Sequence, residues 1–435
     1  MHSTLRRAGG FAVVGTLALA APALNGAAFA PFAAVALFAA FVITDGPLFE
    51  LFARPGDRQD GRLNGLAGFA LAAAGLAIFA TVMDLPVDLF VAAVVVLAYG
   101  NLGAELVAET SDDPFLGTAG FVFGGFLAGV LAQAAVASYV GAEVLLPRFA
   151  FLAAAAALVA ALVREVLFEQ DDPLVMLSAG LLLWLFDFLA DSVAPVEITL
   201  ALVVTVFFGY VSYALGTASV PGMLTGVLLG LLTIVFGGFG WFAVLISFFA
   251  IGGLSAKFKY DAKKDRGVAE DNDGARGTGN VLGNAAVALV AVVLFAASPW
   301  LPVGASVFQY AFAGSLAAAM SDTLSSEIGG LYDNPRLITT FETVAPGTDG
   351  GVTWQGELAG VAGAGIVAAF AYVVFSDVAL AGASVVLLGG VVGMTVDSLL
   401  GATVEGDRIG NEAVNFAATV VGALVSTVVA LAALV

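Results

Sequence analysis

The sequence has no cysteine and a single histidine, His2, in 435 residues. Disulfides, thiolate catalysis, Cys/His metal sites and histidine acid–base chemistry are therefore excluded. Charged residues make up only 11% of the chain, whereas hydrophobic residues make up 60%. Such a composition cannot cover a soluble globule with polar side chains. The chain is predicted to lie in a lipid bilayer, and its chemistry must use carboxylates, hydroxyls, Lys or Arg side chains and backbone amides.

Basic residues are scarce as well. The chain has 15 Lys and Arg against 34 Asp and Glu, which gives a formal net charge of -19. This balance excludes nucleic acid as a partner, because nucleic-acid binding relies on basic surfaces. Lysine occurs only at positions 257, 259, 263 and 264. Acidic, lysine-poor loops suit a high-salt cytoplasm, and we therefore expect a halophilic archaeon as the source.

Apolar runs recur along the whole chain and predict an all-α polytopic membrane protein. We count about 15 spans of roughly 20 residues each. They are centred near residues 17, 40, 74, 96, 128, 155, 182, 206, 228, 247, 288, 311, 364, 389 and 423. With the N-terminus in the cytoplasm, every basic residue except Arg148 falls on the cytoplasmic side. The positive-inside rule thus predicts a multi-pass protein of the cell membrane in this orientation.

Short motifs indicate an internal duplication. DGRLNGLAG at 60–68 resembles DGARGTGNVLG at 273–283, and GNLGAEL at 100–106 corresponds to DTLSSEI at 322–328. Seven spans, one extra span and seven more would give two parallel copies. We therefore predict a degenerate N-terminal repeat at 1–195, a linker helix at 196–217 and a C-terminal repeat at 218–435. The alternative is chance similarity among helices rich in Gly, Ala and Leu.

The two predicted copies differ in polar content. At three matched positions only the C-terminal copy is charged: Asp322 against Gly100, Arg336 against Phe115, and Asp349 against Ala119. Glu105 and Glu327 are acidic in both copies. One active site is therefore expected, in the C-terminal copy.

A basic, glycine-rich loop at 257–280 is the largest charged segment of the chain. Its candidate phosphate-binding residues are Lys263, Lys264, Arg266, Arg276 and Asn280. Flexible backbone and several cations suit an oligophosphate. The alternative is a solvated anchor that fixes the orientation of the neighbouring helix.

The segment SDTLSSEIG at 321–329 places Asp322 and Ser325 on one helix face with small residues around them. Such an acid admits the close approach of a metal or a phosphate, whereas Glu327 in the same segment is expected to point elsewhere, stacked over Thr323. Polar residues inside an apolar span are costly, which favours a function. The alternative is a solvated helix end.

A second candidate loop, PGTDGGVTWQGELAG at 346–360, surrounds Asp349 with Gly347, Gly350 and Gly351. A glycine-rich turn before a helix offers backbone N–H groups to an anion, and its Asp is a candidate Mg²⁺ ligand. The alternative is an ordinary tight turn.

Asp397 lies in the next predicted helix, and Asn411 and Asn415 follow a short loop. Helix packing and capping are the alternative for these three residues. All of these segments are predicted at the cytoplasmic ends of helices.

Three segments carry a family resemblance: SDTLSSEIG, PRLITTFETVAPGTDGGVTWQGELAG, and DSLLGATVE followed by NEAVNF. They resemble the signature segments of the transmembrane protein 19 and phytyl-phosphate kinase family, a domain of unknown function (DUF92), over residues 218–435. The chain is more distantly similar to dolichol kinases and CDP-diacylglycerol synthases.

The resemblance implies that the terminal phosphate of a nucleoside triphosphate, CTP, is transferred to an isoprenyl monophosphate of the phytyl or geranylgeranyl type. Phosphoryl transfer needs Mg²⁺ and cations more than it needs a general base. On this reading Asp322 and Asp349 hold Mg²⁺, with Asp397 and Glu327 as further candidates. The residues expected to contact the nucleotide and phosphates are Lys263, Lys264, Arg266, Arg276, Asn280, Ser325, Arg336, Gly347, Gly350 and Gly351.

Two other functions stay open at this point. One is cytidylyl transfer to a lipid phosphate, which would use the same metal and release pyrophosphate. The other is membrane transport, since parallel helical repeats also occur in transporters. A transporter predicts polar groups near the middle of the bilayer, whereas here they are predicted at one face.

Overall fold

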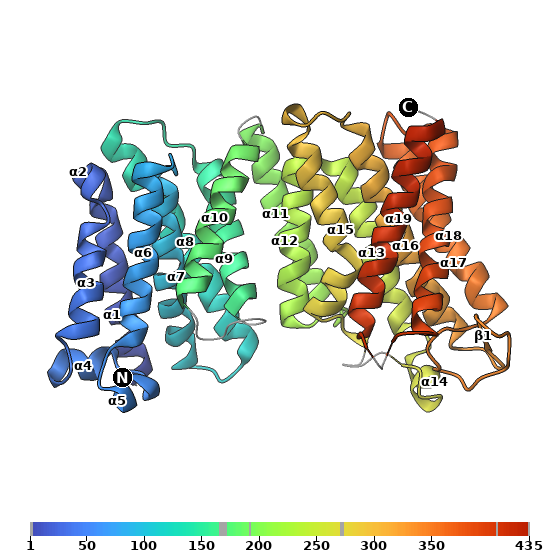
Figure 1. Ribbon diagram of the computed structural model, residues 1–435, viewed down its shortest axis with the longest axis horizontal. Coiled ribbons are helices and arrows are strands. Elements are labelled where there is room, and N and C mark those ends of the chain that lie inside the picture. The colour runs from blue at the N-terminus through green and yellow to red at the C-terminus, as the bar shows by residue number, and fades with distance from the viewer. Residues whose placement is uncertain (1–2, 165–171, 191–192, 270–273, 406–407, 434–435) are drawn as a thin grey trace. The chain divides into compact units, whose positions relative to one another are not determined.

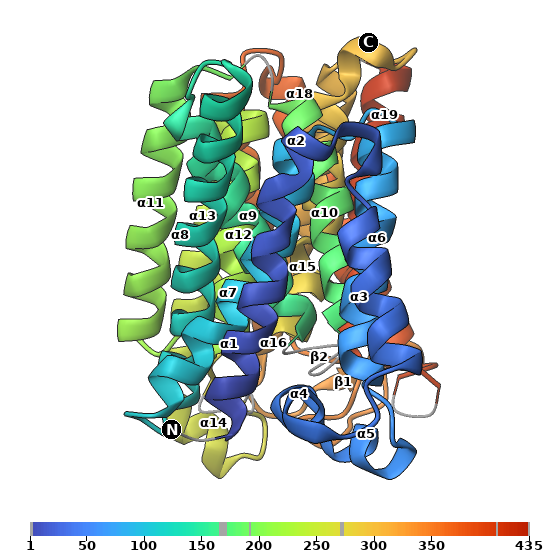
Figure 2. The ribbon, with the colours of Figure 1, turned by 90° about the vertical axis from the view of Figure 1, so that its left-hand side faces the viewer.

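The computed structural model describes residues 3–164, 172–190, 193–269, 274–405 and 408–433. The chain forms two compact units, Met1–Leu200 and Ala201–Val435 (Figure 1). Within each unit the long helices run roughly parallel to one another, as both views show (Figures 1 and 2). The boundary falls inside the segment 196–217 that was expected to be a linker helix; that role, and the repeat boundaries on either side of it, stay predictions.

The first unit is built around helix α7 (Val87–Ala108). The α7 residues from Leu89 to Ala98 are almost completely buried, because α7 packs against α1, α6, α8, α9 and α10. The elements of this unit are α1 (Ser3–Thr16), the short helix η1 (Leu17–Ala20), α2 (Ala21–Leu24), η2 (Asn25–Ala27), α3 (Ala30–Phe41), α4 (Gly46–Phe52), α5 (Pro55–Asp60), α6 (Asn64–Val82), α8 (Pro114–Val140), α9 (Leu146–Leu162) and α10 (Asp172–Leu189).

The second unit is built in the same way around helix α16 (Ser306–Gly329), which packs against α13, α15, α17, α18 and α19. Its other helices are α12 (Val220–Gly237), α13 (Phe239–Lys257), α14 (Tyr260–Asp265), α15 (Thr278–Ala296), η5 (Ser298–Trp300), α17 (Trp354–Val374), α18 (Leu380–Gly401) and α19 (Asn411–Ala433). Helix α11 (Pro195–Ala214) begins in the first unit and ends in the second. Strands β1 (Arg336–Leu337) and β2 (Gly351–Val352) pair antiparallel in the loop before α17.

The predicted all-α polytopic fold is confirmed. Among the described residues, 12 helices are long and apolar enough to cross a membrane, or up to 13 if the pair α3 and α4, bent by 104°, forms one span. Every predicted span centre lies within one of the helices given above, but the count of fifteen is not confirmed. Helix α9 has only 17 residues, and α16 is not among the candidate spans because its Ser, Thr, Asp and Glu residues lower its hydropathy.

The polar composition of α16 has a physical reason. Helices pack around α16, and its polar residues Ser315, Ser321, Thr323 and Glu327 are buried within the protein. Polar groups in a bilayer are tolerated where the protein covers them or where they line a water-filled cavity.

The same set of helix pairs packs together in both units. In the first unit the pairs are α6–α7, α7–α8, α8–α9, α7–α9, α6–α10, α7–α10 and α9–α10; in the second they are α15–α16, α16–α17, α17–α18, α16–α18, α15–α19, α16–α19 and α18–α19. An internal duplication predicts this correspondence. The arrangement of seven, one and seven spans stays a prediction.

Candidate functional site

A polar cavity of about 480 Å³ lies at one end of the second unit. Residues of α15, α16, α18, α19 and the loop that carries β1 and β2 line it. The described residues that define this polar cavity and are used below are Asn280, Asn284, Asp322, Thr323, Ser325, Glu327, Asp349, Thr353, Asp397, Glu405, Asn411 and Asn415. Most of the acidic and amide residues expected at the site therefore do come together.

The last turns of α16 form one wall of the polar cavity. Asp322, Ser325 and Glu327 all line it, together with Thr323. The sequence placed Asp322 and Ser325 on a common face, and the structure brings both to the cavity. Because α16 is the central helix of the unit, its contacts with the neighbouring helices hold this wall in place.

The loop before α17 forms a second wall, and its shape depends on Gly350. Gly350 has a φ of 71°, a left-handed conformation that favours glycine. A Cβ at this position would lie only 2.6 Å from the Ser398 carbonyl oxygen and from the Ala402 amide nitrogen. Glycine thus lets the loop touch the end of α18. Asp349, Gly347 and Gly351 reach the polar cavity as a result, as the glycine-rich motif predicted.

Among the residues that the structure describes, five carboxyl groups line the polar cavity: Asp322, Glu327, Asp349, Asp397 and Glu405. The Asp322 and Asp397 carboxyl groups lie within hydrogen-bonding reach of each other. The Oδ2 atom of Asp397 is buried and has no hydrogen-bond partner. Burial, followed by the nearby charges of Asp349 and Glu412, raises the pKa of Glu405 above its ordinary value. The cavity thus concentrates negative charge that a cation would relieve.

Amide side chains face the acids from two helices. Asn280 and Asn284 are one turn apart on α15, and Asn411 and Asn415 are one turn apart on α19. The Oδ1 atoms of Asn280 and Asn284 are buried without hydrogen-bond partners. Asn284 is not among the residues that the sequence predicts for the site. Its spacing of four from Asn280 is the signal that could have found it, because residues four apart share a helix face.

Three helices begin at the polar cavity. Thr353 immediately precedes α17 and its hydroxyl accepts from the Gly356 amide at 3.2 Å. Asn280 lies in the first turn of α15, and Asn411 is the first residue of α19. Helix N-termini carry partial positive charge and offer N–H donors to anions. The site therefore combines carboxylates suited to a cation with helix ends suited to a phosphate.

The predicted basic residues take other places. Among the residues that the structure describes, no Lys or Arg lines the polar cavity. Lys263 is buried, pairs with Glu327, and donates to the Ser255 and Ala256 carbonyl oxygens at 3.0 and 2.6 Å. Lys263 lies in α14, and it therefore joins this short helix both to the end of α13 and to α16.

The polar cavity is not lined by Arg266, Arg336 or Lys264 either. Arg266 bonds the Gly330 carbonyl oxygen at 2.9 Å and pairs with Asp333. The Arg336 guanidinium is exposed and bonds the Phe341 carbonyl oxygen at 2.9 Å. Lys264 is exposed. The phosphate contacts expected of these residues and of Lys263 stay predictions, because the structure does not bring these side chains together in the polar cavity.

Arg276 occupies an intermediate position. It is 4% exposed, and its Nη2 atom lies 3.4 Å from the Thr323 hydroxyl, which lines the polar cavity. Its guanidinium also lies over the Phe248 ring, 4.9 Å from the ring centre. Arg276 therefore stands directly behind one wall of the polar cavity.

The oxygen-only ligand set fits Mg²⁺. In the described parts of the chain, no three Asp, Glu, His or Cys side chains are placed to hold a metal ion among themselves. Mg²⁺ commonly takes one or two carboxylates, with substrate phosphates and water as its other ligands. Asp322 and Asp397 form such a pair, and the partnerless Asp397 Oδ2 and Asn280 Oδ1 atoms offer further oxygens. The three predicted metal ligands, Asp322, Asp349 and Asp397, all line the polar cavity, and Asp397 lies within hydrogen-bonding reach of Asp322. Their binding of Mg²⁺ stays a prediction.

Comparison with known proteins places this region in a family. Residues 203–423 match the family described as "Integral membrane protein DUF92". An uncharacterized membrane protein of Methanocaldococcus jannaschii is 37% identical over 213 residues, which is 48% of this chain and 84% of that protein. An uncharacterized membrane protein of Synechocystis is 30% identical over 203 residues, 44% of this chain and 76% of that protein. Protein VTE6, chloroplastic, of Arabidopsis thaliana is 35% identical over 144 residues, 33% of this chain and 43% of that protein. No solved structure matches the chain.

Proposed function

Because the chain belongs to the DUF92 family of integral membrane proteins, whose signature segments line its polar cavity, we propose that it is a membrane-embedded kinase. It transfers the terminal phosphate of a nucleoside triphosphate, CTP by family resemblance, to an isoprenyl monophosphate. The observation that carries the proposal is the pairing of acidic side chains with three helix N-termini in one cavity, without a Lys or Arg among its described lining residues. Such a site repels a bare oligophosphate but suits a magnesium-bound one.

The reaction joins two phosphates. An oxygen of the isoprenyl monophosphate attacks the terminal phosphorus of the nucleotide, the bond from that phosphorus to the bridging oxygen breaks, and a nucleoside diphosphate leaves. The attacking phosphate is already ionised, so no side chain needs to remove a proton. The absence of cysteine from the sequence, and of any histidine other than His2, is compatible with this chemistry.

The residues of the polar cavity have separate tasks in this proposal. Asp322 and Asp397 would hold Mg²⁺, which when bound neutralises phosphate charge and orients the phosphates. Asn280 and Asn284 would orient the bound groups through their amides. The N-terminus of α17 would bind phosphate oxygens through backbone N–H groups. Asp349 is held next to α18 by Gly350 and is the candidate for a second cation contact.

A test uses purified protein in nanodiscs with Mg²⁺, CTP labelled at its terminal phosphate, and geranylgeranyl phosphate. Label in the lipid product supports the kinase. Label in pyrophosphate supports cytidylyl transfer instead, and the absence of both products contradicts lipid-phosphate chemistry and favours transport. Asp112→Asn is the matched control, because Asp112 is exposed in the loop between α7 and α8 of the other unit.

A further inference from the structure

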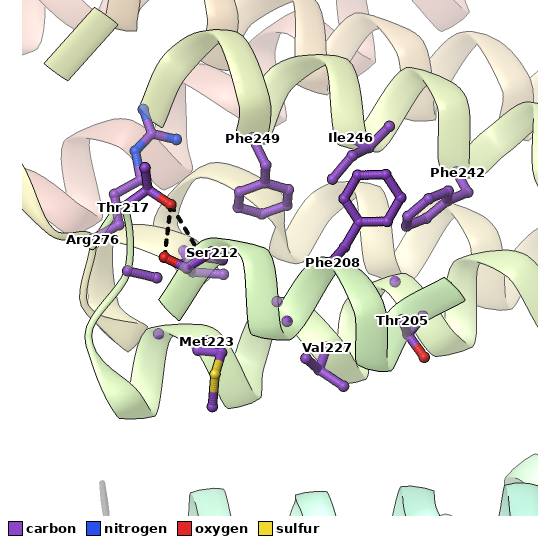
Figure 3. A pocket seen from close by; sticks show the side chains of 16 residues that line it. Thr205, Phe208, Ser212, Thr217, Met223, Val227, Phe242, Ile246, Phe249 and Arg276 are labelled. Atoms are coloured by element: carbon purple, nitrogen blue, oxygen red, sulfur yellow. Dashed lines mark hydrogen bonds between the residues drawn. The ribbon is translucent and has the colours of Figure 1, made fainter. Parts of the chain in front are cut away.

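A second, apolar slot of about 70 Å³ lies between helices α11, α12 and α13. Its sides are formed mainly by Phe208, Phe242, Ile246 and Phe249. Figure 3 shows these side chains following one another away from Arg276, which stands at one end. The slot is thus apolar along its length and cationic at that end.

The α12 side of the slot is smooth because it carries Gly222, Gly226 and Gly230, spaced by four residues. Gly222 packs on the Arg276 backbone, and a Cβ at Gly230 would lie 3.1 Å from the Phe242 ring. A Cβ at Gly226 would meet no atom within 4 Å. Gly226 therefore faces the open part of the slot, which a larger side chain at this position would fill.

Arg276 connects the slot to the polar cavity. Its side chain lines the slot, and its guanidinium reaches Thr323, which lines the polar cavity. Its backbone is fixed as well, since its amide donates to the Thr217 carbonyl at 3.1 Å and its carbonyl accepts from the Ser219 amide at 3.0 Å. A rigidly held, buried guanidinium thus marks the junction of an apolar and a polar compartment.

We infer that this slot binds the isoprenyl chain of the lipid phosphate next to its headgroup, with the phosphate directed toward Arg276. The inference rests on the proposed function. An amphiphile with an apolar chain and an anionic end matches both the chemistry and the order of the groups along the slot. The slot has room for only part of a geranylgeranyl chain, so the rest of the chain extends beyond it.

The test measures binding without nucleotide, so that it does not depend on catalysis. Labelled geranylgeranyl phosphate is titrated against the protein in nanodiscs. Gly226→Leu should weaken binding about tenfold or more, because the added side chain fills the slot. Gly75→Leu is the matched control, since a Cβ at Gly75 of α6 also meets no atom within 4 Å but Gly75 lies in the other unit. Unchanged affinity in Gly226→Leu would overturn the inference.

Two further comparisons separate the contribution of the isoprenyl chain to binding from that of the phosphate. Arg276→Gln should weaken binding of geranylgeranyl phosphate while leaving binding of the uncharged alcohol geranylgeraniol unchanged, and Arg276→Lys should restore part of the loss. Competition by phosphatidic acid as effective as by unlabelled substrate would show an acyl-lipid site and overturn the inference. If the wild-type protein binds geranylgeranyl phosphate and Gly226→Leu weakens this binding, but no label is transferred from CTP, only the proposed kinase activity is contradicted.

Discussion

The two units share a helix-packing pattern, but the polar residues at the equivalent end of that pattern are arranged differently. In the first unit, Arg54 pairs with Asp172 at the start of α10, and Asn101 of the central helix α7 donates to the same carboxylate at 3.2 Å. The Arg54 guanidinium also lies 5.6 Å from the centre of the Phe11 ring. The charges of Arg54 and Asp172 thus neutralise each other there, and the Asn101 amide adds a hydrogen bond to the carboxylate.

In the second unit, the acids and amides at this end line an open cavity instead. Asp322 and Asp397 lie together, and no Lys or Arg is among the described residues that line this cavity. The comparison teaches that one scaffold can close a polar cluster around an ion pair or open it into a cavity lined by several acids. The following predictions test this difference, from the largest expected effect to the smallest.

The largest effect is expected at Asp322. Asp322→Asn keeps the size of the side chain but removes the charge that would hold Mg²⁺, so we expect kcat to fall by about 100-fold or more. The measurement is transfer of label from CTP to geranylgeranyl phosphate, with folding checked by thermal unfolding. Asp112→Asn should keep wild-type activity. Full activity in Asp322→Asn would contradict the assignment of this cavity as the site.

The ion pair of the first unit should matter for stability and not for chemistry. Asp172→Ala leaves the Arg54 charge without its partner in a partly buried place, which typically costs about 3–5 kcal/mol. We expect a lower free energy of unfolding and unchanged kcat per folded molecule. Arg58→Ala, which removes the exposed pair with Glu50, should cost at most about 1 kcal/mol. A selective loss of kcat in Asp172→Ala would show that the first unit takes part in the reaction.

The buried pair Lys263–Glu327 gives an intermediate case, because Glu327 lines the polar cavity while its carboxylate is bound to Lys263. Lys263→Met alone should destabilise by about 3 kcal/mol, since it leaves a buried carboxylate without its cation. The double variant Lys263→Met, Glu327→Leu should recover most of this loss. We expect its kcat to stay within about tenfold of wild type. A stable but inactive double variant would make Glu327 part of the catalytic machinery.

The sequence predicted well what depends on local pattern. The apolar runs located the helices, and the motif around Gly350 indicated a turn that brings Asp349 to a helix start. The acid cluster of α16 was visible because polar residues in an apolar span need a reason.

What depends on tertiary packing could not be predicted. Lys263 lies in a highly charged loop, and its neighbours gave no sign that it would be buried against Glu327. The contact between Asp322 and Asp397 joins residues on helices far apart in the sequence, so no local spacing encodes it. The bend between α3 and α4, by contrast, has a local signal that a count of apolar runs misses, because Asp45, Gly46 and Pro47 interrupt the apolar sequence there.

The smallest effect is expected at Glu405, which lies after α18 beside Asp349. Its pKa is raised, so ionisation of its carboxyl group costs more in the folded state than in the unfolded chain. The resulting stabilisation is present at low pH and is lost as the pH rises through the pKa of the folded state. Glu405→Gln removes the penalty and should raise Tm slightly at pH 8 without Mg²⁺, by less than about 3 °C. Added Mg²⁺ should narrow the difference, because a bound cation relieves the same repulsion. Equal Tm values for both proteins between about pH 5 and 8 would mean that the acids of this cavity do not repel one another, and the contrast with the neutralised end of the first unit would then have no energetic basis.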